Sequence, residues 1–206
     1  MQKWWFPILY MFLITAFFSS VVIGLTQFNS ERVAANEKIA FEKAVVQALA
    51  GLYVEDTSRL DLHRTFVERV TEPDEESAGA YTLRKEGQIV AYALPFSGRG
   101  FWAPIKGVIG IDADRKTINA IAFYQQNETP GLGAEITKPP FRQQFEGKVI
   151  AARERPVSFK RPGAELGPSD VHAVTGATQT STRLEKIINT QLVEWRSRLT
   201  QRSNRQ

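Results

Sequence analysis

The sequence predicts an α+β fold, in which a single domain with an antiparallel sheet and flanking helices stands on an N-terminal transmembrane helix. Three observations lead to this prediction. Residues 4–26 contain no charged side chain, two pairs of strand-like segments each enclose a short polar turn, and the last long segment repeats apolar residues at helical spacing. The expected divisions are a transmembrane anchor at 4–26, an amphipathic connecting helix at 27–51 and a folded domain at 52–206.

The anchor is predicted from its length and its aromatic residues. An apolar helix over 4–26, rising about 1.5 Å per residue, is long enough to cross the hydrocarbon core of a bilayer. Trp4 and Trp5 stand at its front, where interfacial anchors use tryptophan. A cleaved signal peptide has a shorter apolar region and a small-x-small site. The exit here reads Gly-Leu-Thr-Gln-Phe-Asn-Ser, so we expect an anchor that is not cleaved.

The connecting helix and the strands follow from periodicity. Residues 29–51 place apolar residues among charged ones at helical spacing, which predicts a helix that ends near Gly51. Two β-hairpins come next, because alternating segments flank Lys85-Glu86-Gly87 and Asp112–Lys116. The expected strands are 80–83, 88–94, 104–111 and 117–124.

A glycine-rich and then aromatic segment, Ser97–Trp102, lies between the two hairpins. Its glycines allow a bend, while Phe101 and Trp102 are suited either to cap the sheet or to line a ligand. We expect at least one of the two rings to pack into the core. The remaining expected elements are a short helix at 140–146, extended segments at 148–152 and 155–159, and an amphipathic helix at 180–199.

Composition excludes several kinds of chemistry. The chain has no cysteine, which excludes disulfides, thiolate zinc sites and iron–sulfur clusters. His63 and His172 are its two histidines, and His172 stands beside Asp170 alone, so no metal site is assigned. The sequence contains no nucleophile elbow, so it does not indicate a hydrolase.

The net charge of +4 and the isoelectric point near 9.4 do not point to nucleic acid. A nucleic-acid surface would concentrate its cations on one face. Here the arginines crowd the C-terminus, which indicates a solvated helix end and tail. They are Arg196, Arg198, Arg202 and Arg205.

The first motif with a chemical meaning is the loop Asn127–Glu135, which reads NETPGLGAE. Its Pro-Gly pair suits a tight turn, and Gly133 allows a second close backbone approach. Glu128 and Thr129 bring an acceptor and a hydroxyl, and Leu132 is suited to rest against a flat ring. The alternative is a loop whose glycines serve only the turn.

The second motif is Val174–Ser181, which reads VTGATQTS and directly precedes the expected last helix. A small, hydroxyl-rich turn at a helix start leaves backbone N–H groups unpaired, and these favour a phosphate. The hydroxyl of Thr178 is also able to carry that phosphate covalently. The alternative is a simple N-cap by Thr178, Thr180 or Ser181. The motif lacks the lysine and glycine spacing of a P-loop.

Together these motifs resemble a known family. The chain is similar to the FMN-binding domain of the C subunit of the sodium-translocating NADH:quinone reductase, and to the G subunit of the Rnf complex. The resemblance rests on four motifs in chain order: the Gly-Phe-Trp segment, the Glu-Thr-Pro-Gly-Leu-Gly loop, the Phe-Glu-Gly-Lys stretch and the Thr-Gly-Ala-Thr turn. The resemblance implies FMN joined through its phosphate to the threonine that ends the turn, Thr178. It implies that Thr175, Gly176, Ala177, Thr180 and Ser181 lie around the phosphate, and that Glu128, Thr129, Leu132 and Gly133 lie near the isoalloxazine.

The resemblance also implies a function. The chain would be a membrane-anchored flavoprotein subunit that relays electrons in an ion-translocating NADH:quinone or Rnf-type oxidoreductase and is not catalytic alone. Its partners would be other membrane subunits and a flavin transferase. Its place would be the bacterial inner membrane, single-pass, with the soluble domain outside the cytoplasm. Two alternatives stay open: a stand-alone extracytoplasmic FMN-linked electron carrier, and a non-redox membrane-tethered binding domain that has lost its flavin.

One position departs from the family pattern. Family members usually carry an acidic residue six places before the flavin-bearing threonine, and the flavin transferase is thought to need it. This chain has His172 there and Asp170 two residues earlier.

Overall fold

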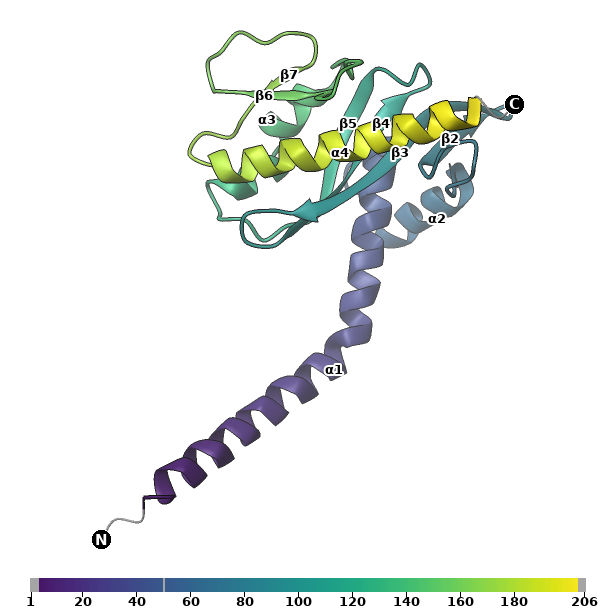
Figure 1. Ribbon diagram of the computed structural model, residues 1–206. Coiled ribbons are helices and arrows are strands. Elements are labelled where there is room, and N and C mark those ends of the chain that lie inside the picture. The colour runs from purple at the N-terminus through teal and green to yellow at the C-terminus, as the bar shows by residue number, and fades with distance from the viewer. Residues whose placement is uncertain (1–3, 50, 204–206) are drawn as a thin grey trace. The chain divides into compact units, whose positions relative to one another are not determined.

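The structure is a computed structural model that describes residues 4–49 and 51–203. The chain divides into two compact units, residues 1–38 and 39–206, which are described separately. Helix α1, Phe6–Ala48, begins in the first unit and ends in the second (Figure 1).

In the first unit, α1 is long and apolar enough to cross a membrane by length and composition. Trp4 and Trp5 form a turn directly before it. The helix continues through the expected connecting segment and ends at Ala48, three residues before Gly51. Gly51 lies in the left-handed region at φ 79°, a conformation that helices use just after their ends.

The second unit is built on a five-stranded sheet in the order β1-β2-β3-β4-β5, with every neighbouring pair antiparallel. A separate two-stranded sheet pairs β6 and β7 in parallel. The strands are β1 Val70–Thr71, β2 Tyr81–Lys85, β3 Gln88–Arg99, β4 Pro104–Asp112, β5 Ile118–Gln125, β6 Ser158–Lys160 and β7 Asp170–His172. The helices of this unit, besides the end of α1, are α2 Arg59–Arg69, η1 Gly133–Thr137, α3 Pro139–Arg142, η2 Gln143–Phe145 and α4 Thr178–Ser203.

One face of the sheet is covered by α4, which runs across the strands in Figure 1. Successive side chains of a strand point to opposite faces, and Tyr92, Leu94 and Phe96 of β3 all pack in the cluster that holds the buried side of α4. Trp195 of α4 is fully buried there, with its ring 5.3 Å from that of Tyr92. Its indole N–H donates to the carbonyl oxygen of Ser77 at 2.8 Å.

The other face of the sheet packs against the last turns of α1. Here β3 contributes the small residues Ala91 and Ala93, which alternate with the large ones facing α4. Val45 and Leu49 are fully buried against them. The helix approaches so closely that a Cβ at Gly110 would overlap the carbonyl oxygen of Ala48. Small side chains on this face therefore make room for the helix.

The predicted α+β fold with an antiparallel sheet is confirmed, and both predicted hairpins are present. The turn at Lys85–Gly87 places Glu86 and Gly87 at φ 51° and 80°, as a type I′ hairpin requires. The predicted last helix is confirmed and is longer at both ends. The predicted short helix at 140–146 is present as a helix from Pro139 that becomes a 3-10 turn.

Several elements differ from the prediction, and three of the differences follow here. Helix α2 was not predicted, although Ser58 caps it and accepts from the backbone N–H of Asp61 at 3.2 Å, a Ser-x-x-Asp start signal. The expected strand at 148–152 is reduced to one bridge between Thr117 and Val149. The expected strand at 155–159 is shifted to β6, which pairs with the unpredicted β7.

Candidate functional site

The candidate site begins at the first residue of α4. Thr178 is exposed there, after a turn in which the N–H of Ala177 donates to the carbonyl oxygen of Val174 at 3.1 Å. Gly176 holds φ 74°, which favours glycine because it lacks a Cβ. Within the described residues, no acceptor is assigned to the backbone N–H of Thr178. The turn therefore presents a free hydroxyl together with the positive end of a helix.

The two sequence motifs lie side by side. A Cβ at Gly176 would come within 2.9 Å of the Cδ2 atom of Leu132, and Leu132 is 42% exposed. The loop that carries Leu132 is closed by the N–H groups of Leu132 and Ala134, which both donate to the carbonyl oxygen of Thr129 at 3.1 Å. An apolar side chain is thus held against the turn that precedes Thr178.

Glu128 connects three segments of the site through one buried carboxylate. It is 5% exposed. Its Oε1 accepts from the backbone N–H of Phe101 at 2.9 Å and of Trp102 at 3.2 Å, and its Oε2 accepts from the hydroxyl of Thr180 at 2.7 Å. Sequence reasoning placed Glu128 near a ring, whereas the structure directs both carboxylate oxygens to donors of the protein.

Two glycines make room for this carboxylate. A Cβ at Gly133 would lie 2.5 Å from Oγ1 of Thr180 and 2.9 Å from Cβ of Glu128. A Cβ at Gly100 would lie 2.5 Å from Oε1 of the same glutamate. Gly133 therefore serves close packing around Glu128, and not only the turn.

Phe101 and Trp102 form an exposed aromatic pair beside this clamp. They are 42% and 68% exposed, and their rings meet edge to face at 4.9 Å. The indole N–H of Trp102 donates to the hydroxyl of Thr129 at 3.1 Å. The expectation that at least one ring packs into the core is wrong, because Glu128 holds the backbone of both residues at the surface. Leu132, on the same loop as Thr129, is a third exposed apolar side chain of the site.

Arg183 is a site residue that sequence reasoning missed. Its guanidinium carbon lies 5.9 Å from the centre of the Phe101 ring. Its Nε atom is buried and has no hydrogen-bond partner within the described residues. The signal was available: Arg183 follows Thr180 by three positions on a helix, a spacing that puts two side chains on one face.

The hydroxyls of Thr180 and Ser181 lie inside the domain. Thr180 is 3% exposed and Ser181 is 2% exposed. Thr180 donates to Glu128, and the hydroxyl oxygen of Ser181 accepts from the N–H of Val174 at 3.1 Å. Both side chains thus stabilise the turn from within, while Thr175 and Thr178 face outward.

His172 and Asp170 lie on β7, ahead of the turn. The ring Nε2 of His172 hydrogen-bonds to the carbonyl oxygen of Ala164 at 2.8 Å. Asp170 accepts from the N–H of Gly167 at 3.1 Å and forms long ion pairs with Arg153 and Lys160. Across the described part of the chain, no three His, Asp or Glu residues are grouped to hold a metal ion.

These residues fit a phosphate attached to a flat aromatic group. The free N–H and hydroxyl of Thr178 suit the phosphate, and Arg183, beside the Phe101 ring, adds a positive charge whose buried Nε has no partner within the described residues. The exposed rings and Leu132 offer apolar contact to a planar ligand. The arrangement is therefore compatible with a flavin mononucleotide.

Comparisons with known proteins also lead to FMN. Residues 100–193 match the family described as FMN-binding domain. The chain is similar to the C subunit of the Na(+)-translocating NADH-quinone reductase of Pasteurella multocida, 36% identical over 107 residues that cover 50% of this chain and 41% of that protein. It is also similar to the protein of the same name in Neisseria meningitidis, 26% identical over 209 residues, with 79% and 80% covered.

The fold has solved counterparts. The crystal structure of the C subunit of the Na(+)-translocating NADH-quinone reductase from Parabacteroides distasonis superposes with a TM-score of 0.68 at 24% identity, covering 82% of this chain and 96% of that one. This likeness shows the fold alone. The chain spans only 34–42% of the first three curated relatives that it matches. The predicted resemblance is confirmed: residues 100–193 match the FMN-binding domain family, and the chain is similar to C subunits of the Na(+)-translocating NADH-quinone reductase.

Proposed function

We propose that this protein is a membrane-anchored flavoprotein subunit that carries FMN in phosphoester linkage to Thr178 and relays electrons within an ion-translocating NADH:quinone or Rnf-type oxidoreductase complex. The observation that carries the proposal is the exposed Thr178 hydroxyl at the start of α4, together with the exposed side chains of Phe101, Trp102 and Leu132. The curated relatives bear the name of such a subunit.

The chain's own residues hold and orient the group. The first-turn N–H groups of α4 and the guanidinium of Arg183 would face the phosphate, because both present positive charge to an anion. Glu128 fixes the backbone of Phe101 and Trp102 relative to α4 through three hydrogen bonds. The aromatic surface would exclude water from one side of the ring. FMN, when bound, supplies reversible transfer of electrons, which no side chain here provides.

The wider setting belongs to the same proposal. The apolar part of α1 would anchor the domain in the bacterial inner membrane as a single span, with the domain outside the cytoplasm. The partners would be the other membrane subunits of the complex, and a flavin transferase would load Thr178. His172 stands in place of the usual acidic residue, and its ring hydrogen-bonds to the backbone at Ala164.

The first prediction tests the attachment site in chains purified from the native host. Thr178→Ala should abolish flavin fluorescence after denaturing electrophoresis, because the esterified hydroxyl is gone. Thr182→Ala is the matched control, since Thr182 is an exposed threonine one turn further along the same helix. Fluorescence retained by the Thr178 variant, or lost from the Thr182 variant, would contradict the assignment.

Two further measurements separate the rival functions. Visible absorption of flavin in the purified wild-type protein excludes a domain that has lost its cofactor. Co-purification with quinone-reductase subunits distinguishes a member of a complex from a stand-alone electron carrier.

A further inference from the structure

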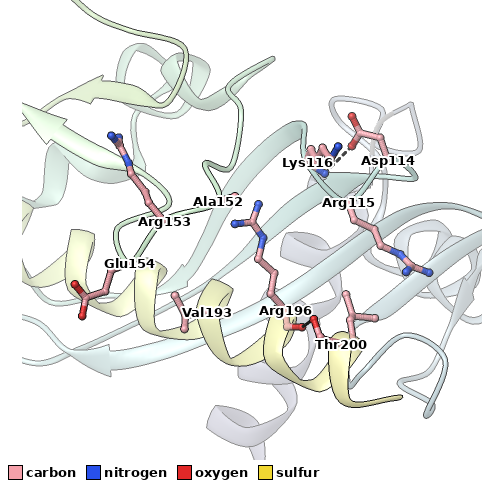
Figure 2. Close-up of a pocket in the computed structure, with 10 residues that line it drawn as sticks. Asp114, Arg115, Lys116, Ala152, Arg153, Glu154, Val193, Arg196 and Thr200 are labelled. Atoms are coloured by element: carbon pink, nitrogen blue, oxygen red, sulfur yellow. Dashed lines mark hydrogen bonds between the residues drawn. The ribbon is translucent and has the colours of Figure 1, made fainter. Parts of the chain in front are cut away.

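A groove lies at the other end of α4 from Thr178. It is bordered by the turn between β4 and β5, by the segment around Ala152 and by the C-terminal half of α4 (Figure 2). Its volume is about 770 Å³. Val193, which lines it, lies roughly 22 Å along the helix from Thr178 at 1.5 Å per residue. The groove is therefore separate from the candidate flavin site.

Positive charge dominates the groove. Four cations and two acids line it. One of the acids, Asp114, is held within its own turn, where it accepts from the N–H groups of Lys116 and Thr117 and from the Thr117 hydroxyl. The other acid, Glu154, is exposed. The cations are Arg115, Lys116, Arg153 and Arg196, of which Arg153 also hydrogen-bonds to Arg155 and Ser158 and lies 3.8 Å from Asp170.

Arg196 places a partly buried charge on the floor of the groove. Sequence reasoning placed it in a solvated helix end, whereas its guanidinium donates to the carbonyl oxygens of Ile150 and Ala151. Figure 2 shows it rising from α4 toward that segment. Burial lowers the pKa of Arg196, and no carboxylate of the described residues lies within 4.0 Å of it. An anion in the groove would offset this loss of hydration.

Arg115 is held in place at the edge of the groove. It occupies φ 60°, a conformation that glycine adopts without strain, so an arginine here carries a cost of about 1 kcal/mol. Its Nε donates to the hydroxyl of Tyr92 at 3.1 Å, and its guanidinium lies 5.7 Å from the centre of that ring. A cation fixed in this way loses little conformational freedom when an anion binds.

The shape of the groove indicates what kind of anion binds. Val193 is 42% exposed along its wall, and Leu199 also lines it, so the cations surround an apolar strip. Small ligands are bound in pockets that enclose most of their surface, and this groove is open. An extended segment, with several carboxylates and apolar side chains between them, fits both the charge and the shape. We infer that the groove is a docking surface for an acidic segment of a partner protein.

The inference is tested with a defined probe and the full-length chain in non-ionic detergent. Fluorescein-labelled octaglutamate should bind, as measured by fluorescence anisotropy, and its affinity should fall with added salt because the contacts are ionic. Octalysine should not bind. Failure of octaglutamate to bind, or equal binding of octalysine, would overturn the inference.

Charge reversal locates the binding surface. The triple variant Arg115→Glu, Lys116→Glu, Arg153→Glu should raise the dissociation constant at least about tenfold. The matched control reverses three exposed arginines on α2, Arg59, Arg64 and Arg69, and changes the net charge equally. It should change the constant less than about twofold, and an equal effect of both triples would mean that only net charge matters.

Two further binding measurements complete the test. Lys116→Glu alone covers the case in which the triple variant does not fold, because the side chain of Lys116 is exposed and interacts with Asp114 only at long range. This single variant should still weaken binding, and unchanged affinity would count against the groove. Phosphatidylglycerol vesicles form the second arm: binding that is stronger than that of octaglutamate and lost in the same variants would replace the acidic segment by a lipid head group. None of these readouts depends on flavin at Thr178.

Discussion

At the scale of single residues, the carboxylate of Glu128 joins the loop before β4 to the first turn of α4. It satisfies two backbone N–H groups and the hydroxyl of Thr180 in a place that is 95% shielded from water. A buried donor left without its acceptor costs about 1–3 kcal/mol. Truncation of Glu128 would therefore release the loop, while glutamine would keep its shape and remove its charge.

The second prediction uses that difference. Glu128→Gln should retain covalent flavin and shift its midpoint potential to more positive values, because one negative charge fewer in a low-dielectric region favours the electron-rich form of the cofactor. Glu194→Gln, roughly 24 Å along α4 from Thr178, is the control and should leave the potential unchanged. A spectroscopic redox titration measures both. Identical potentials in the wild type and the Glu128 variant would show that the carboxylate does not act on the flavin.

Sequence reasoning identified the segments of the site better than their contacts. The motifs around Leu132 and Thr178 were recognised from local turn chemistry, and the structure brings them together. The bond between Glu128 and Thr180 joins residues 52 positions apart, and no local pattern encodes such a pairing. The exposure of Phe101 was misjudged for the same reason, since a distant carboxylate holds its backbone.

At the scale of elements, the turn between β4 and β5 is stabilised by Asp114. The hydroxyl and the backbone N–H of Thr117 both donate to its carboxylate, and they hold the pKa of Asp114 below its usual value. A depressed pKa in the folded state stabilises the protein above the unfolded value of 3.8. This contribution is lost as the pH falls through the folded pKa.

The third prediction follows from this loss of stability at low pH. Between pH 6 and pH 3, the melting temperature of the wild type should fall further than that of Asp114→Asn. The reason is that asparagine keeps the turn but has no charge to lose. Glu154→Gln, at an exposed glutamate of the neighbouring segment, should follow the wild type. Circular dichroism melts of the full chain in detergent at the two pH values measure the difference. An equal fall in melting temperature in the wild type and the Asp114 variant would show that the Asp114 carboxylate does not stabilise the protein in this way.

Elements with strong local signals were predicted, and elements with weak ones were not. The two hairpins combine alternating residues with a short polar turn, and both are present. Strands β6 and β7 have three residues each and pair in parallel across a loop, so neither periodicity nor a turn marks them. Helix α2 was missed despite its cap, because Leu62 is its only buried residue and the apolar stripe is weak.

At the scale of the whole molecule, the end of α1 belongs to the folded domain. The chain divides after residue 38, and residues 44, 45, 48 and 49 form the core of the sheet's second face. Burying one valine or leucine side chain contributes roughly 1.5–3 kcal/mol. Losing this helix would uncover the sheet, so the predicted domain boundary at residue 52 is a hypothesis that truncation can test.

The fourth prediction compares two truncated chains. Residues 39–206 should be soluble, monomeric and cooperatively folded, whereas residues 52–206 should aggregate or melt at a markedly lower temperature. The physical reason is the exposure of Val108, Ala122 and their neighbours once Val45 and Leu49 are gone. Size-exclusion chromatography and thermal melts give the answer. A shorter chain as stable as the longer one would place the boundary at residue 52.

The exposure of Thr178 has a consequence for the order of events in the cell. Under the proposed function, an enzyme that esterifies this hydroxyl would reach it from solvent without opening the domain, because Thr178 is exposed at the start of the helix. Newly made chains would therefore mature after they have folded. A shortage of riboflavin would then leave a reserve of intact, colourless protein that is ready for loading, rather than a pool of chains destined for proteolysis.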